Sequence, residues 1–158
     1  MCTIRKMTAS DMGDVSSIIS SHDSLDGTLA AAYYSAYFAD ARRDGSDREQ
    51  NVVAVSQGVV LGVIGFAPDE YNLPDILWLN WFYVHPAHRG VGIGTRLLEH
   101  ILTTMRQLCV RKAYLDTESG EPYAASVRLY GRFGFQVEGR LLDYYGKGRD
   151  CLIMGLAI

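Results

Sequence analysis

Features of secreted, membrane-spanning and metal-binding proteins are scarce in this sequence. Its three cysteines, Cys2, Cys109 and Cys151, are an odd number and lack the paired spacing of a zinc site or a disulfide framework. No apolar run approaches the ~20 residues that cross a bilayer, and the first residues have no hydrophobic signal-peptide region. We therefore expect a cytoplasmic protein with reduced thiols, no metal ion and no membrane partner.

Clusters of positive charge are also missing. Fifteen Lys and Arg residues stand against eighteen Asp and Glu residues, a formal net charge of −3. Nucleic-acid-binding proteins carry a basic footprint, so nucleic acid is not an expected partner. The 48% hydrophobic and 21% charged residues are globular values, and 158 residues suit a single domain over residues 1–158. A homodimer is one assembly that the sequence leaves open.

Hydrophobic periodicity predicts an α/β fold with a mixed sheet, in the order β-α-α-β-β-β-α-β-α-β-β. The expected strands are 3–6, 51–55, 59–66, 76–84, 113–117, 135–141 and 151–156. The first two helices are expected after a capping box at 8–11 and from about residue 29 to 43, with a stop at Gly45. Two later helices are expected after Gly92 and with Pro122 in the first turn, the last one stopping near Gly134. The first half of the sheet should be antiparallel, and a parallel strand-helix-strand crossover should follow.

The most informative segment is the glycine-rich stretch that follows the strand at 76–84. Glycines there let a ligand approach the backbone, and the start of the next helix supplies N–H groups and a positive dipole end that suit a phosphate. A P-loop would need lysine after its last glycine, but Thr95 and Arg96 follow Gly94. The dinucleotide fingerprint would need glycine at Thr95. What remains is Arg-x-x-Gly-x-Gly, preceded by Val-x-Pro at 84–86.

That stretch resembles the acyl-CoA pyrophosphate loop of the GNAT superfamily of N-acyltransferases, and the predicted element order is similar to the GNAT fold from end to end. The resemblance implies that acetyl-CoA is the co-substrate and that backbone N–H groups of the loop bind its pyrophosphate. It also implies that the end of the preceding strand pairs with pantetheine. The residues implied in cofactor binding here are Phe82, Tyr83, Val84, Arg89, Gly90, Val91, Gly92, Ile93, Gly94 and Thr95.

A second motif, Leu-Tyr-x-x-x-Gly-Phe at 129–135, is similar to the end of the GNAT helix whose tyrosine lies near the CoA sulfur. By this resemblance Tyr130 is the general acid for the departing thiolate, and a phenol with a pKa of about 10 is protonated at neutral pH. The family often has asparagine and alanine where this chain has Tyr123 and Ser126. Ser126 is therefore expected to replace the amide contact to CoA, and Arg132 is a candidate partner of its 3′-phosphate.

No general base is visible in the sequence. Glu70, Asp75, Glu118 and His85 are candidates outside any motif, and ordered water often serves in the family. His22 and His100 have no partner pattern and are expected on the surface. Simple packing would explain most of the remaining aromatics, but five of them are candidates for an aromatic wall around a cationic amine: Tyr33, Tyr34, Trp81, Tyr144 and Tyr145.

These observations predict an N-acetyltransferase in which an amine attacks the thioester directly in a ternary complex. No cysteine has a nucleophile pattern, so a covalent acyl-enzyme is not expected. The expected acceptor is a small amine. Two alternatives stay open: an acetyltransferase acting on peptide N-termini or lysines, and a non-catalytic acyl-CoA-binding or sensor module.

Overall fold

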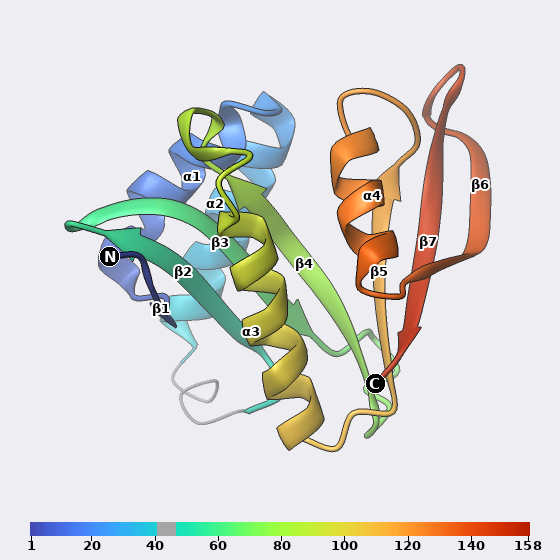
Figure 1. The fold of residues 1–158 in the computed structure, drawn as a ribbon, viewed down its shortest axis with the longest axis horizontal. Helices are drawn as coiled ribbons and strands as arrows, with labels where there is room; N and C mark the ends of the chain where they lie inside the picture. Colours follow the sequence, from blue (N-terminus) through green and yellow to red (C-terminus); the bar gives the residue numbers. More distant parts are fainter. Residues whose placement is uncertain (41–46) are drawn as a thin grey trace. The chain divides into compact units, whose positions relative to one another are not determined.

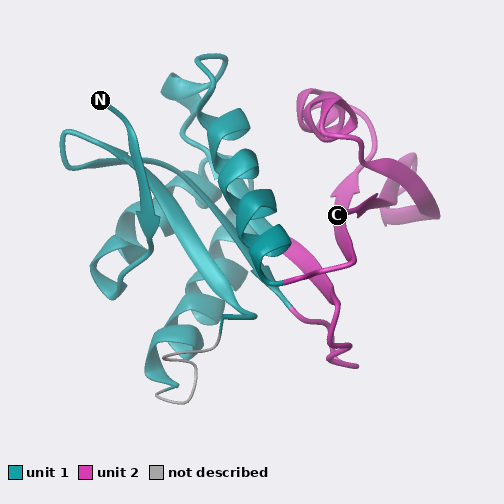
Figure 2. Cartoon of the chain, turned by 60° about the horizontal axis from the view of Figure 1, so that its bottom comes forward, with its two compact units in different colours: residues 1–67, 80–108 teal, residues 68–79, 109–158 magenta. Residues whose placement is uncertain are grey.

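The computed structural model describes residues 1–40 and 47–158, and the elements follow one another in the predicted order (Figure 1). Seven strands hydrogen-bond in the order β1-β2-β3-β4-β5-β7-β6. The described residues form two compact units, one with residues 1–67 and 80–108 and the other with residues 68–79 and 109–158 (Figure 2). Strand β4 (Ile76–Val84) contributes its first half to the second unit and its second half to the first.

The first unit holds an antiparallel ladder covered by helices. Its elements are β1 (Thr3–Lys6), the 3-10 turn η1 (Ala9–Asp11), α1 (Met12–Ser20), α2 (Ser24–Ala39), β2 (Gln50–Ser56), β3 (Val59–Ala67), η2 (Pro86–His88) and α3 (Ile93–Gln107). Strand β1 pairs antiparallel with β2, and β2 with β3, with Val53 opposite Val63. Helices α1 and α2 lie on one face of these strands and α3 lies on the other (Figure 1).

Successive side chains of a strand point to opposite faces of the sheet, which explains why helices cover both faces of β2 and β3. Val53 and Val63 pack with Ile19 and other residues of α1 and α2 in one core. A Cβ at Gly62 would lie 3.1 Å from a methyl carbon of Leu97, which places the opposite strand face against α3. That helix is amphipathic, and Leu97 and Ile101 on its apolar side are fully buried. The spacing of the apolar residues in the sequence predicts this buried side of α3.

Asp11 anchors the N-terminal segment of the first unit. Its carboxylate accepts two hydrogen bonds from the Arg5 guanidinium at 2.7 and 2.8 Å and one from the Thr8 backbone N–H at 2.8 Å. The Arg5 hydrogen bonds, opposed by burial and helped by Thr8, lower the pKa of Asp11 to about 2. The predicted capping box at Thr8–Asp11 is thus confirmed.

Helix α2 begins five residues before the predicted start at residue 29. Asp23 explains the difference, because its side chain accepts hydrogen bonds from the N–H groups of Leu25 and Asp26 at 2.8 and 3.0 Å. The predicted end at residue 43 and the stop at Gly45 lie outside the described residues. None of the helices in the described ranges is long and apolar enough to cross a membrane.

The second unit contains the parallel part of the sheet. Its elements besides the start of β4 are β5 (Lys112–Glu118), α4 (Ala124–Arg132), β6 (Gln136–Gly146) and β7 (Arg149–Ala157). Strand β4 runs parallel to β5 over three residue pairs, beginning with Ile76 opposite Lys112, and β7 lies antiparallel between β5 and β6. The predicted mixed sheet with its parallel crossover is confirmed. Pro122 precedes α4 by two residues, so its expected place in the first turn is wrong.

Strands β6 and β7 are longer than their predicted ranges of 135–141 and 151–156. The polar segment between them was expected to be a connection, but only Lys147 and Gly148 form the turn. Asp143 makes this possible: it adopts a φ of +55°, and its carboxylate accepts a 2.6 Å hydrogen bond from the Gly148 N–H. The Asp143 N–H in turn donates to the buried Asp150 at 2.8 Å. The hydrogen-bonded pairing of β6 and β7 therefore continues through this polar segment, with a shift of register between Leu141 and Gly146.

Candidate active site

The glycine-rich loop joins β4 to α3 within the first unit. The His85 N–H donates to the Leu61 carbonyl at 2.8 Å, which fixes the end of β4 against β3. A short 3-10 turn, η2, follows, and the His85 Nδ1 atom accepts a hydrogen bond from the Ala87 N–H at 3.2 Å. Gly90 and Gly92 then have φ angles of +76° and +87°, a region that glycine adopts without steric cost. The order strand, tight loop, helix is the predicted one.

The N-terminus of α3 has the features of an anion site. Gly92 is its N-cap residue, and neither a capping side chain nor an acidic residue of the first turn is present there within the described ranges. The N–H groups of Ile93, Gly94 and Thr95 lie in the first turn, where a helix provides no acceptors for them. A Cβ at Gly90 or Gly92 would meet no atom within 4 Å, so the backbone is open to a ligand. These features fit a bound phosphate group.

Arg89 contacts the end of β4 and the side chain of His22. Its Nε atom donates to the Val84 carbonyl at 3.4 Å. Its Nη2 atom lies 2.5 Å from Nε2 and 3.1 Å from Nδ1 of His22, in the turn between α1 and α2. The His22 Nε2 atom lies 3.2 Å from the same Val84 carbonyl. The prediction that His22 is a surface residue without a partner is therefore wrong. Nothing in the local sequence identifies a contact between residues 67 positions apart.

The predicted aromatic wall is divided between the two units. Tyr33, Tyr34 and Trp81 gather in the first unit, with ring centroids 5.8 Å apart for Tyr33 and Trp81 and 6.4 Å apart for Tyr34 and Trp81. Tyr144 and Tyr145 are exposed neighbours on β6 in the second unit, with ring centroids 4.9 Å apart. The Tyr145 hydroxyl donates to Asp116 at 3.1 Å.

A polar cluster that the sequence did not indicate surrounds the Tyr33 hydroxyl. This hydroxyl donates to the Glu49 carboxylate at 2.9 Å and accepts a hydrogen bond from the Asn51 amide at 3.3 Å. The side-chain oxygens of Asn51 and Asn80 are buried and have no partner among the described residues. Both lie where a Cβ of Gly65 would be, at 2.2 and 2.4 Å from that position. Any side chain at Gly65 would displace them.

Tyr130, the predicted general acid, is buried on α4 in the second unit. Its ring packs edge-to-face on Phe135, with centroids 6.0 Å apart. Burial, and secondarily the negative charge of Asp116, raises the pKa of the Tyr130 phenol above its ordinary value. The phenol is therefore protonated throughout the neutral range. On the same helix Ser126 is half-buried, and Arg132 is exposed in the last turn.

The carboxylates considered as bases are mostly in structural contacts. Glu118 is buried and accepts two hydrogen bonds from Arg149, at 2.6 and 2.7 Å. Asp75 pairs with Arg111 at 2.7 Å. Glu70 is exposed on the loop before β4. None of these contacts identifies a base.

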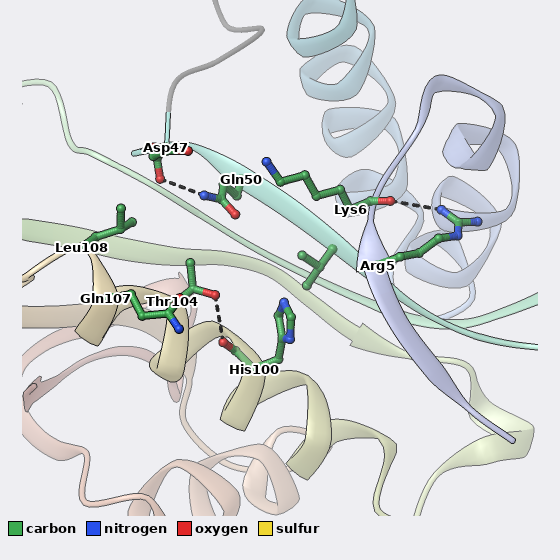
Figure 3. A pocket seen from close by; sticks show the side chains of 9 residues that line it. Arg5, Lys6, Asp47, Gln50, His100, Thr104, Gln107 and Leu108 are labelled. Atoms are coloured by element: carbon green, nitrogen blue, oxygen red, sulfur yellow. Dashed lines mark hydrogen bonds between the residues drawn. The ribbon is translucent and has the colours of Figure 1, made fainter.

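A cavity of about 420 Å³ lies elsewhere in the first unit, between the β1–β2 edge and the C-terminal part of α3 (Figure 3). Lys6, Gln50 and His100 are among its lining residues, and Thr104 donates to the His100 carbonyl at 3.0 Å. None of the residues predicted to bind cofactor or to act in catalysis lines this cavity. His100 is exposed there, as expected.

Comparison with known proteins identifies the family. The model of the acetyltransferase (GNAT) family matches residues 19–135. Spermine/spermidine N(1)-acetyltransferase of Bacillus subtilis (strain 168) is 32% identical over 80 residues, 50% of this chain and 51% of that protein. The chain thus matches about half the length of this curated relative.

Solved structures have the same fold over nearly the whole chain. A GNAT-family protein from Desulfovibrio desulfuricans is 22% identical, covers 99% of both chains and has a TM-score of 0.88. A protein from Salmonella typhimurium, solved with acetyl-CoA, is 25% identical over 99% of this chain and 93% of its own, with a TM-score of 0.77. With a family model that spans most of its length and a fold shared from end to end, the chain belongs to the GNAT family of acetyltransferases.

Proposed function

We propose that this protein transfers an acetyl group from acetyl-CoA to a small primary amine. The observation that carries the proposal is the N-terminus of α3, where Gly90 and Gly92 leave open space over a helix end without a side-chain cap. Membership of the GNAT family gives this anion site its expected ligand, the pyrophosphate of CoA. The N–H groups of Ile93, Gly94 and Thr95 would bind it, with Arg89 adding a charge-assisted contact.

The backbone of β4 at Phe82–Val84 is proposed to pair with the amides of pantetheine, as a peptide pairs with a strand. An N–H group of the same segment would donate to the thioester carbonyl oxygen, which gains negative charge as the amine attacks. On α4, Ser126 and Arg132 are proposed as further contacts to CoA. These assignments need backbone groups and two polar side chains, and no metal ion takes part.

The proposed reaction is a direct transfer. The neutral amine nitrogen forms a bond to the carbonyl carbon, the carbon–sulfur bond breaks, and the electron pair leaves with sulfur. Tyr130 donates its proton to that sulfur, and water takes the proton that the amine nitrogen loses. The raised pKa of Tyr130 keeps this proton in place until the thiolate forms.

The acceptor is proposed to be a small cationic amine. Tyr33, Tyr37 and Trp81 present aromatic rings on the α2 side of the first unit, and the Glu49 carboxylate beside Tyr33 supplies a negative charge. Aromatic faces and carboxylates attract ammonium groups. The Bacillus subtilis relative, whose name refers to spermine and spermidine, supports the same class of acceptor.

Acetyl-CoA binding and turnover test the proposal. Acetyl-CoA at a hundredfold excess over its Kd should stabilise the fold by about 2.7 kcal/mol, measured as a rise in Tm. Polyamines, other small amines and peptides would then be incubated with the enzyme and acetyl-CoA, and acetylated products identified by mass spectrometry. Turnover of peptides alone would favour the peptide acetyltransferase, and binding without any turnover would favour the acyl-CoA-binding module. Failure to bind acetyl-CoA at millimolar concentration would exclude all three.

A further inference from the structure

His22 is held between the end of β4 and the side chain that follows it in the loop. Its Nε2 atom lies 3.2 Å from the Val84 carbonyl, and the Arg89 Nη2 atom lies 2.5 Å from the same Nε2 atom and 3.1 Å from Nδ1. The ring also packs edge-to-face on Tyr83, with centroids 5.0 Å apart. The imidazole therefore connects the turn between α1 and α2 to the start of the glycine-rich loop.

The contact with Arg89 requires a neutral imidazole. A guanidinium only donates hydrogen bonds, so the ring nitrogen that it approaches must carry a lone pair. Either neutral tautomer of His22 offers one such nitrogen to Arg89. The imidazolium offers none, because both nitrogens then carry hydrogen and the two side chains carry like charges. Protonation of His22 must therefore break this contact.

We propose that His22 is a positioning residue: its neutral ring holds Arg89 against the Val84 carbonyl, and its protonated ring releases Arg89 to the phosphates of CoA. This inference rests on the proposed binding of CoA at the loop. It adds that the Val84 carbonyl, in the strand segment expected to pair with pantetheine, is covered by Arg89 and His22 before CoA binds. Cofactor binding and protonation of His22 should then favour each other.

Other charged and titratable groups surround this contact. Asp26 of α2 accepts a 2.6 Å hydrogen bond from the Tyr83 hydroxyl and contributes a negative charge near His22. Asp23, next to His22, is occupied as the N-cap of α2. His85, just before η2, and His88 of η2 face each other, with ring centroids 5.3 Å apart, and are the other histidines close to the loop. An experiment must therefore separate His22 from these two.

The direction of the pH effect follows from linkage. Burial lowers the pKa of His22 in the free protein, the hydrogen bond with the Val84 carbonyl partly opposes this, and the positive charge of Arg89 lowers the pKa further. A bound pyrophosphate brings negative charge and removes Arg89, so both changes favour the imidazolium. Binding therefore takes up a proton, and affinity rises as the pH falls toward and below the ordinary His pKa of about 6.5.

The probe is 3′-dephospho-CoA, because the 3′-phosphate of CoA itself titrates near pH 6. One coupled proton changes Kd by at most about tenfold per pH unit, so Kd should tighten about threefold to tenfold between about pH 7.5 and pH 5.5. Calorimetry near pH 6 in buffers of different ionisation enthalpy would measure the proton uptake directly. A purely structural role of His22 would not produce this uptake.

Three variants identify the source of the effect. His22→Gln keeps one donor and one acceptor but cannot become charged, so its Kd should stay close to the high-pH value of the wild type at every pH. His88→Gln is the matched control and should retain the pH dependence. Arg89→Ala should bind more weakly and show a flatter pH profile, since His22 acts through Arg89.

Each outcome decides between the two proposals. Wild-type protein that binds the probe with a pH-independent Kd and no proton uptake overturns the role of His22 but leaves CoA binding intact. A full pH dependence in His22→Gln, or in Arg89→Ala, also overturns it. Absence of binding at every pH, for dephospho-CoA and CoA alike, refutes the proposed function itself. Because proton uptake is measured on the wild type, the test does not depend on a variant that folds.

Discussion

Replacing Tyr130 by phenylalanine tests the general acid with a change of one oxygen atom. The ring and its edge-to-face contact with Phe135, at 6.0 Å between centroids, would remain. Loss of one hydrogen-bonding hydroxyl from a buried site costs about 0.5–1.5 kcal/mol of folding stability. The variant should therefore fold, with a Tm only a few degrees below that of the wild type.

The expected loss of activity follows from the environment of the phenol. Burial and the charge of Asp116 raise the pKa of Tyr130 above its usual value of about 10, whereas an ordinary thiol has a pKa of about 8.5. Tyr130 is therefore a weaker acid than the thiol that it protonates. General acid catalysis contributes about 10²–10⁴-fold, and this mismatch places the expected fall in kcat near the lower limit, about 10²-fold.

The assay follows release of the CoA thiol at saturating acceptor, between pH 7 and pH 10. The KM for acetyl-CoA should stay nearly constant, because the lost interaction forms only as the carbon–sulfur bond breaks. Wild-type kcat should show no loss from ionisation of Tyr130 below about pH 10, since a raised pKa keeps the phenol protonated. Tyr114→Phe, which removes a hydroxyl from a ring stacked on Trp78, is the matched control.

Two results would refute this reasoning. A Tyr130→Phe variant with wild-type kcat, under conditions where chemistry limits the rate, would make Tyr130 a packing residue. A variant with weakened CoA binding and unchanged kcat would make it a cofactor contact, and water would then have to protonate the thiolate.

Three further outcomes are expected. The folded state lowers the pKa of Asp11 to about 2, so about 2 kcal/mol of stability should be lost as the pH falls through about 4 to 2, and Asp11→Asn should abolish that loss in acid-denaturation curves. Gly92→Ala should lower both Tm and CoA affinity because of its φ of +87°, whereas Gly131→Ala, in a helix with open space around it, should preserve both in melting and titration experiments. In steady-state kinetics, Glu49→Gln should raise the KM of a cationic acceptor severalfold but leave the KM of acetyl-CoA unchanged. Tyr33→Phe removes the hydroxyl bonded to Glu49 and should have a smaller effect on the KM of the acceptor.

The order of the elements was predictable because each depends on a short sequence pattern. The apolar spacing of α3 and the β-rich run at Ile76–Val84 both identify their elements. Two of the errors in element boundaries lie where one polar side chain sets the boundary. Asp23 starts α2 early, and Asp143 allows β6 to continue through a segment that reads as a loop. In both cases the carboxylate accepts a hydrogen bond from a backbone N–H group.

The parts of the site also differ in whether they depend on a short sequence pattern or on contacts between distant residues. The glycine-rich loop was predictable because the strand end, the glycines and the helix start are contiguous in the sequence. The contact of His22 with Arg89 and the hydrogen bonds of Tyr33 with Glu49 and Asn51 join residues from separate elements. Composition and spacing contain no signal for such pairs, since any of these residues would also suit an exposed surface.

Strand β4 connects the polar cluster around Tyr33 to the glycine-rich loop, and its backbone is irregular at Trp81. In a regular strand, neighbouring side chains point to opposite faces. Asn80 nevertheless lies beside Asn51, which bonds the Tyr33 hydroxyl, and Trp81 packs on the ring of the same tyrosine. Tyr83 reaches Asp26 of the same helix at 2.6 Å. The φ of +48° at Trp81 explains this, because a left-handed residue shifts the alternation of a strand as a bulge does.

This backbone conformation is uncommon for a large aromatic residue and costs about 1–3 kcal/mol, which the surrounding contacts must offset. They do so from both sides: the Trp81 ring packs on Tyr33 and Tyr34, and the Val84 carbonyl that follows is held by His22 and Arg89. Within five residues, β4 therefore passes from the proposed amine side to the proposed cofactor loop. The left-handed residue at Trp81 thus lets one strand direct side chains toward the proposed amine site and its following backbone toward the proposed cofactor loop.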